Sequence, residues 1–187
     1  MNSKKSWLFG AALIAIGGFA GSAQAADIDT PTPEQYEALG WYLRADAGWS
    51  FLQWYGGRDD DALTVGGGVG YQFTPNIRGD VRGDWSGDYN IGGGADMSMT
   101  TVLGNLYYDF PNDSFLTPYL GAGIGYGWAP IDGGEDKEGL AYSLMAGSSI
   151  DLSESVSLDV GYRFREIIDS GADPMDHSIL GGVRFKF

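Results

Sequence analysis

The stretch RGDVRGDW, residues 78–85, contains two Arg-Gly-Asp triplets separated by one valine. A triplet displayed at a loop tip could bind an integrin-type adhesion receptor. In a β-strand, alternate side chains point to opposite faces of the sheet. All four charged residues of this stretch would then share one face: Arg78, Asp80, Arg82 and Asp84. The choice between adhesion site and structural ladder therefore depends on the element that contains the stretch.

A second candidate for chemistry is the pair His177-Ser178, which has the residue types of a general base and a nucleophile. Neighbouring residues in a strand face opposite sides, so these two cannot act on each other. A serine from an adjacent strand remains open as a partner. We expect His177 to be a rim residue at the outer interface of the fold, and we predict no catalytic residues.

Two acidic runs could gather a calcium or magnesium ion, because hard cations prefer carboxylate oxygens. Neither run has the spacing of a calcium-binding loop, so a solvated surface is the default interpretation, and a divalent ion bridging the acidic segments to an anionic partner is the alternative. The glycine clusters match neither GxGxxG nor a Walker loop. We therefore predict no cofactor and no dedicated metal site. The acidic residues concerned are Asp59, Asp60, Asp61, Asp132, Glu135, Asp136 and Glu138.

The charge of the chain narrows the class of partner. Its 11 Lys and Arg against 25 Asp and Glu give a formal net charge of −14. Nucleic-acid-binding proteins show basic patches, so we predict no nucleic-acid partner. The absence of cysteine from the sequence excludes disulfides and thiolate metal sites.

The first residues predict export. Lys4 and Lys5 precede an apolar stretch, and a small-residue motif ends at Ala25. This is the pattern of a secretory signal peptide over residues 1–25, cleaved after Ala25. Residues 26–39 contain prolines without alternation, and we interpret them as an extended periplasmic leader. Residues 40–187 form one predicted domain.

From Trp41 onward the apolar residues recur with a period of two, which predicts strands. In WYLRADAGWSF, Trp41, Leu43 and Trp49 lie on one face, with Arg44 and Asp46 on the other. The pattern recurs seven more times. The connections alternate between tight turns and longer acidic segments, which is typical of an up-and-down membrane barrel. The predicted long loops are residues 53–61, 87–96, 131–139 and 166–176.

Four features indicate which face lies inside. The polar faces combine Arg with Asp, as suits a closed interior. One polar face also carries a row of glycines, which in a narrow lumen would leave room for neighbouring side chains: Gly121, Gly123, Gly125 and Gly127. The apolar faces end in aromatic residues that would form interfacial girdles. The exported chain is also disulfide-free. We therefore predict an all-β, eight-stranded antiparallel up-and-down transmembrane barrel with short periplasmic turns and four longer extracellular loops. A soluble barrel with its faces inverted is the alternative.

The segments WYLRADAGWSF, NLYYDF, PYLGAGIGYGW, LDVGYRF and HSILGGVRFKF together resemble the small outer-membrane barrels of the OmpA- and OmpX-like family, with opacity-type surface antigens as the nearest group. The resemblance implies the cell outer membrane as location, with outer-membrane lipid and lipopolysaccharide as partners. It also implies that Phe187, together with Phe185, is the signal read by the barrel assembly machinery. It supplies no surface ligand.

Charges that face the lumen need partners, because an unpaired buried charge is costly. We therefore predict Arg–Asp pairing across strands that plugs the barrel. The predicted lumen residues are Arg44, Asp46, Arg78, Asp80, Arg82, Asp84, Asp109, Asp159, Arg163, Arg184 and Lys186.

The predicted function is that of a monomeric, non-enzymatic surface protein that contributes to envelope structure. The main alternative is an adhesin or ligand-binding protein acting through its acidic loops, with Trp54, Tyr55 and Tyr89 as anchors. A narrow porin and a lipid A-modifying enzyme are further alternatives.

Overall fold

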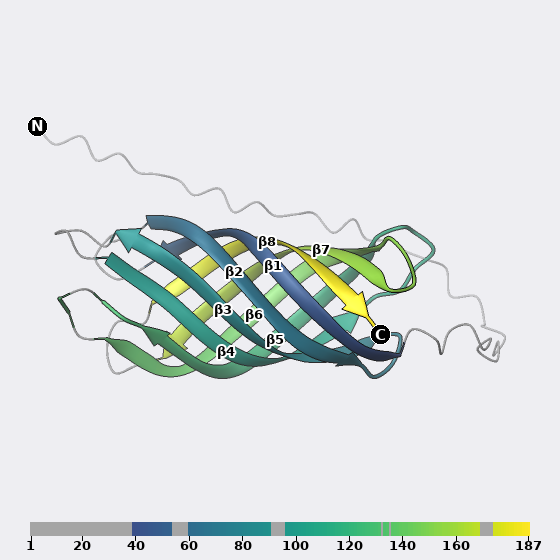
Figure 1. Ribbon diagram of the computed structural model, residues 1–187, viewed down its shortest axis with the longest axis horizontal. Coiled ribbons are helices and arrows are strands. Elements are labelled where there is room, and N and C mark those ends of the chain that lie inside the picture. Colours follow the sequence, from purple (N-terminus) through teal and green to yellow (C-terminus); the bar gives the residue numbers. More distant parts are fainter. Residues whose placement is uncertain (1–38, 54–59, 91–95, 132, 135, 169–173) are drawn as a thin grey trace, which may run out of the picture. The chain divides into compact units, whose positions relative to one another are not determined.

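The computed structural model describes residues 39–53, 60–90, 96–131, 133–134, 136–168 and 174–187. The expected signal peptide and all of the expected leader except Leu39 lie outside these ranges. No helix among the described residues is long and apolar enough to cross a membrane. The described residues form eight strands, drawn in Figure 1: β1 (Gly40–Gln53), β2 (Asp60–Gln72), β3 (Ile77–Asn90), β4 (Asp96–Asp109), β5 (Thr117–Ala129), β6 (Lys137–Asp151), β7 (Val156–Ile168) and β8 (Met175–Lys186).

The strands close into a barrel in sequence order, and β1 completes the ring by pairing antiparallel with β8. Closure leaves no sheet edge, so every strand finds backbone partners on both sides, as hydrocarbon surroundings require. The start of β1 and the end of β8 lie at the end of the barrel that carries the short turns (Figure 1). There the backbone amide of Phe187 donates to the carbonyl of Trp41 at 3.0 Å. The predicted eight-stranded up-and-down barrel is confirmed.

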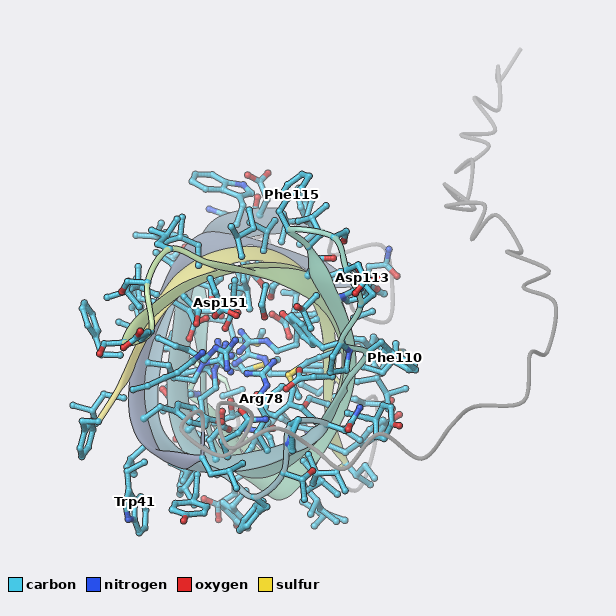
Figure 2. The ribbon with its side chains drawn as sticks, turned by 90° about the vertical axis from the view of Figure 1, so that its right-hand side faces the viewer. Trp41, Arg78, Phe110, Asp113, Phe115 and Asp151 are labelled. Carbon is cyan, nitrogen blue, oxygen red and sulfur yellow. The ribbon has the colours of Figure 1, made fainter. Side chains whose placement is uncertain are left out.

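The outer wall is apolar and the interior is charged. Val81, Leu106 and Ile124 are 58%, 59% and 60% exposed, whereas Arg78 and Arg82 are 0% and 2% exposed. Seen along the barrel from the short-turn end, Trp41 and Phe110 project outward and Arg78 lies inside the ring of strands (Figure 2). A soluble barrel with its faces inverted would instead have the apolar side chains inside and the charged side chains outside. The predicted assignment of the two faces is therefore confirmed.

Aromatic side chains mark both edges of the apolar wall. At the short-turn end Trp41 contacts Tyr71, with ring centroids 5.3 Å apart, and Tyr108 contacts Phe110 at 4.9 Å. At the loop end Tyr126 contacts Trp128 at 5.0 Å. Such rings, apolar in body and polar at the tip, suit the two interfaces of a membrane.

The strands extend further toward the loops than the sequence indicated. Segments 87–96 and 166–176 were expected to be loops, but β3 continues to Asn90, β4 begins at Asp96 and β7 continues to Ile168. Turn-forming Asn and Gly suggested loops, although the alternation of side chains continues through these residues. Apart from Asp176, the inward residues of these extensions are apolar and belong to one cluster at the loop end of the lumen: Leu52, Ala62, Tyr89, Met97, Met99, Leu103, Ala129, Ala141 and Ile167.

The interpretation of Tyr89 as a loop anchor is wrong. Its side chain is 0% exposed and its hydroxyl donates to Ser50 Oγ at 2.7 Å inside the barrel. The other two expected anchors, Trp54 and Tyr55, lie outside the described residues.

Candidate functional site

Glycines in the wall make room for the charged side chains of the lumen. A Cβ at Gly66 on β2 would lie 2.0 Å from Asp84 Oδ1, and a Cβ at Gly182 on β8 would lie 2.3 Å from Asp46 Oδ1. Because both carboxylates lie directly over glycine, any larger residue at these positions would displace them. The lumen is therefore built by pairing large polar residues with glycine on the neighbouring strand.

Arg78 fills the lumen at the short-turn end. Its Nε donates to both carboxylate oxygens of Asp109, each at 3.0 Å. Its guanidinium lies over the rings of Tyr107 and Tyr119, at 4.3 Å and 4.9 Å from their centroids. Figure 2 shows Arg78 from this end, within the ring of strands. A cation held between aromatic faces and a carboxylate closes this mouth of the barrel.

A second group of charges at the same end centres on Asp159. Its Oδ2 lies 2.8 Å from Arg184 Nε, 3.8 Å from Arg44 Nη2 and 3.9 Å from Arg78 Nη1. Ser149 Oγ donates to its other oxygen at 2.6 Å. One carboxylate therefore connects arginines from three strands.

The middle of the lumen is crossed by ion pairs between strands. Arg44 on β1 contacts Asp46 at 2.8 Å and Asp80 on β3 at 3.1 Å. Arg163 on β7 reaches Asp84 on β3 at 2.7 Å, and the same carboxylate contacts Arg82 at 2.8 Å. Since β3 and β7 are not neighbours in the barrel, the pair formed by Arg163 and Asp84 spans the lumen.

A further buried ion pair, which the sequence analysis missed, lies nearer the loops. Arg165 Nε donates to Asp176 at 2.8 Å, and the guanidinium also donates to Thr101 at 2.9 Å and to Ser86 at 2.7 Å. Ser50 and Ser178 also donate to Asp176. Every described member of this network is buried and bonded.

This pair could have been found from the alternation. Arg165 is two residues after Arg163 and therefore shares its face. Asp176 has the same relation to Ser178. Asp176 was missed because residues 166–176 were interpreted as a loop, and Arg165, directly before that segment, was left out of the predicted lumen set.

Ten of the eleven predicted lumen residues are buried inside the barrel, and Lys186 differs. The side chain of Lys186 is 21% exposed and pairs at 3.0 Å with Asp151, whose side chain is 57% exposed. This pair therefore lies at the short-turn rim.

The buried charges of the described lumen balance. Six buried arginines face six buried aspartates, so their formal sum is +6 − 6 = 0. A neutral set avoids an uncompensated charge in a low-dielectric interior. The acidity of the chain therefore lies outside this set. The arginines are Arg44, Arg78, Arg82, Arg163, Arg165 and Arg184, and the aspartates are Asp46, Asp80, Asp84, Asp109, Asp159 and Asp176.

The space left between these side chains is small. An enclosed cavity bordered by Arg44, Asp46, Arg82, Asp159 and Arg163 has a volume of about 10 Å³. That is about the room needed for one water molecule. The apolar cluster lies on the loop side of this cavity and the Arg78 stack on the short-turn side, so buried side chains occupy the lumen at all three levels.

The two residues of the possible catalytic pair point apart. His177 faces outward, with Nδ1 in hydrogen-bond contact with the Tyr162 hydroxyl and its ring 5.3 Å from that of Phe164. Ser178 faces inward and donates to Asp176 at 2.9 Å. The described geometry therefore joins His177 to a tyrosine instead of a serine.

Of the four described residues of the two acidic runs, Glu138 is exposed and the other three accept hydrogen bonds individually. Asp61 accepts a hydrogen bond from Trp49 Nε1, Asp60 from the amide of Asn90, and Asp136 from the amide of Ile131. Within the described ranges no three His, Cys, Asp or Glu side chains gather as metal ligands do. Asp59, Asp132 and Glu135 lie outside those ranges.

Comparisons with known proteins agree with this architecture. The family model described as outer membrane protein beta-barrel domain matches residues 11–187. Uncharacterized proteins of Brucella abortus and Brucella suis are 28% identical, over 85% of this chain and 82% of theirs. The crystal structure of Neisserial surface protein A is similar with a TM-score of 0.71 and 26% identity, over 79% of this chain and 97% of that one. Ail, the attachment invasion locus protein of Yersinia pestis, shares the fold with a TM-score of 0.55 and 14% identity, over 78% and 99% of the two chains.

Proposed function

This chain belongs to the outer membrane protein beta-barrel domain family, and we propose that within it the chain is a non-enzymatic surface protein that contributes to envelope structure. It lies in the cell outer membrane. Its physical work is to remain stably folded there and to present its loops at the surface, while the lumen transports nothing.

The filled lumen is the observation that carries this proposal. Large buried side chains span it from the Arg78 stack to the apolar cluster around Met97 and Met99, and the enclosed cavity between the ion pairs has room for about one water. A pore needs a continuous aqueous path. An enzyme needs a nucleophile within reach of a base, and the outward His177 contacts Tyr162 instead.

The test is conductance of the purified, folded protein in planar bilayers. We expect no steady conductance at levels typical of porins. A stable open level would overturn the structural role and favour the narrow porin. Mass spectrometry of lipid A after overexpression tests the alternative of a lipid A-modifying enzyme. We expect lipid A to be unchanged, and an altered acyl pattern would contradict the non-enzymatic role.

A second candidate is ligand binding through the loops, supported by the likeness to a protein named for its surface location, Neisserial surface protein A. With the lumen filled, a ligand would have to bind the outside of the loops. Replacing Trp54 and Tyr55 with Ala would then weaken binding of host or phage proteins to whole cells. Tyr89→Phe is the matched control, because Tyr89 is buried. Equal binding by all variants would remove this candidate.

We also propose that the barrel assembly machinery recognises the C-terminal aromatic residues. Phe185 and Phe187 are 53% and 74% exposed on the outer wall, where an assembly factor can reach them. Deletion of Phe187 should lower the amount of folded protein in outer-membrane fractions. Wild-type amounts would contradict a role in assembly.

A further inference from the structure

Two of the short turns each carry a large apolar side chain that remains exposed. Phe115, in the turn between β4 and β5, is 76% exposed, and Leu152, in the turn between β6 and β7, is 59% exposed. The turn between β2 and β3 differs, because residues 74–76 are Thr-Pro-Asn. We call Phe115 and Leu152 the turn pair.

Leu152 continues the lipid-facing row beyond the end of β6. Its backbone amide donates to the carbonyl of Val156 at 2.8 Å, so the antiparallel ladder extends one step past the pair formed by Asp151 and Ser157. Ser157 is 0% exposed and faces the lumen. Since neighbouring residues alternate, Val156 and Leu152 point toward the lipid.

Phe115 is held outward by a turn with one well-defined shape. Asn112 Nδ2 donates to the carbonyls of Phe110 and Leu116, each at 3.0 Å. The amide of Ser114 donates to Asn112 Oδ1 at 2.8 Å, and its hydroxyl donates to the carbonyl of Leu116 at 2.8 Å. Figure 2 shows Phe115 outside the ring of strands, as it shows Phe110 at the base of the same turn.

The turn pair adjoins the aromatic edge of the wall at the short-turn end. The ring of Phe110, where the first turn begins, lies 4.9 Å from that of Tyr108. The two turns also follow neighbouring strands, because β5 pairs with β6 and Thr117 lies opposite Ser149. Apolar surface therefore extends past the aromatic edge on the side of the barrel formed by β4 to β7.

Carboxylates in the same turns limit how far this surface can enter the membrane. Asp113 and Glu154 are both exposed. A charge on the outer surface of a barrel is costly at the midplane of the bilayer and nearly free at its interfaces. The turns therefore suit the boundary between head groups and acyl chains, where an apolar side chain can be buried while its charged neighbours remain in water.

From this placement we propose that Phe115 and Leu152 insert into the periplasmic leaflet of the membrane, at the glycerol and upper acyl region of its phospholipids. The membrane boundary then lies further toward the periplasm along β4 to β7 than at the Thr-Pro-Asn turn. The surface that binds lipid includes two turns and is wider than the strands alone. This inference concerns the seating of the barrel in its membrane and goes beyond the proposed function.

Site-directed spin labelling tests the insertion directly. The sequence contains no cysteine, so Phe115→Cys and Leu152→Cys each give one labelling position. Each labelled protein is placed in phosphatidylcholine nanodiscs, whose two faces are both open to water. We expect oxygen, which concentrates in lipid, to relax both labels more strongly than a water-soluble nickel chelate does. Stronger relaxation by nickel at both positions would overturn the proposal.

The matched controls are labels at Asp113→Cys, in the same turn as Phe115, and at Pro75→Cys, in the Thr-Pro-Asn turn. Both labels should be relaxed more strongly by nickel than by oxygen. A label at residue 75 that is as lipid-accessible as the label at residue 115 would contradict the uneven membrane boundary.

Unlabelled variants check the result without a probe at the site. Phe115→Ser should lower the folding equilibrium constant in lipid vesicles by about five- to tenfold, because partial burial of a Phe side chain in lipid is lost. Phe115→Leu should retain most of the wild-type value. Equal constants for wild type and Phe115→Ser would count against insertion, since the protein itself leaves Phe115 exposed.

A periplasmic protein with an apolar cleft is the rival occupant of this surface. In that case the labels at residues 115 and 152 would be accessible to nickel in nanodiscs and shielded from it only in isolated outer membranes, which would contradict lipid insertion. Bilayer conductance is an independent measurement. A conducting barrel would remove the proposed structural role and leave the turn result unchanged, and nickel-accessible turns would remove only the insertion.

Discussion

At the scale of single residues, Asp80 illustrates why the Arg-Gly-Asp triplets are structural. Its carboxylate accepts hydrogen bonds from Arg44 at 3.1 Å, Asn105 at 2.7 Å and Tyr42 at 3.2 Å. Asp80 lies on β3, and these partners come from β1 and from β4, which pairs with β3. The side chain is 6% exposed, so no receptor can reach it.

Replacing Asp80 with Ala should destabilise the barrel, because Arg44 would lose a buried partner. Breaking a buried ion pair by removing one member costs about 3 to 5 kcal/mol. Urea unfolding of the protein in lipid vesicles measures the change. Asp113→Ala is the control, since Asp113 is exposed in a turn and such surface changes are usually within about 0.5 kcal/mol. Unchanged stability of the Asp80 variant, together with reduced cell attachment, would restore the adhesion hypothesis.

At the scale of elements, each strand alternates a lipid-facing and a lumen-facing residue, and glycines occur on both faces for different reasons. Gly66 on β2 faces the lumen directly under Asp84, its register partner on β3. Gly83, on β3, faces the lipid, and nothing lies within 4 Å of the Cβ it lacks. The first glycine is required by packing and the second is not.

Gly66→Ala should therefore lower stability, by about 1 to 3 kcal/mol, because the added methyl forces the Asp84 carboxylate out of its ion pairs. Gly83→Ala should leave stability unchanged or slightly raised, since alanine restricts the unfolded chain more than glycine does. The urea midpoints of the two variants measured side by side decide this. Equal midpoints would show that the lumen tolerates movement of Asp84.

The extended ends of β3 and β4 can be probed through their methionines. Met97 and Met99 are 1% and 0% exposed in the apolar cluster, whereas Met175 on β8 is 37% exposed. Under mild peroxide treatment of the folded protein, Met175 should oxidise first and the other two only when the barrel opens. Peptide mass spectrometry at successive times gives the three rates. Similar rates would mean that the apolar cluster is not formed.

At the scale of the whole molecule, the barrel inverts the usual distribution of polarity. Apolar side chains face the membrane, and a neutral set of six arginines and six aspartates fills the lumen in place of an apolar core. Each strand pairs with two others around a closed ring, so no strand can leave without breaking two ladders. The molecule should therefore unfold cooperatively and slowly.

The expected consequence is a heat-dependent shift in gel mobility. Unheated protein in detergent should migrate as a compact barrel, and boiled protein should migrate as an extended chain. The comparison is made alongside membrane fractionation. Identical mobility together with a soluble fraction would contradict the transmembrane barrel.

Much of this architecture follows from the sequence alone. The period-two alternation is a local property of extended backbone, so it identified the strands and separated Arg78, Asp80, Arg82 and Asp84 from the lipid face. The combination of Arg with Asp on that face, opposite aromatic-ended apolar faces, indicated which side is the lumen. The number of strands, their antiparallel order and the membrane location all followed from patterns within short stretches of chain.

The pairing of the lumen charges was decided by tertiary structure. Arg163 meets Asp84 because closure and stagger of the barrel bring β7 opposite β3, and no local pattern specifies that distance. The same closure buries Tyr89, which the flanking Asn and Gly had placed in a loop, and joins Arg165 to Asp176. Local periodicity determines which face a side chain takes, whereas the shape of the closed lumen determines which partner it finds.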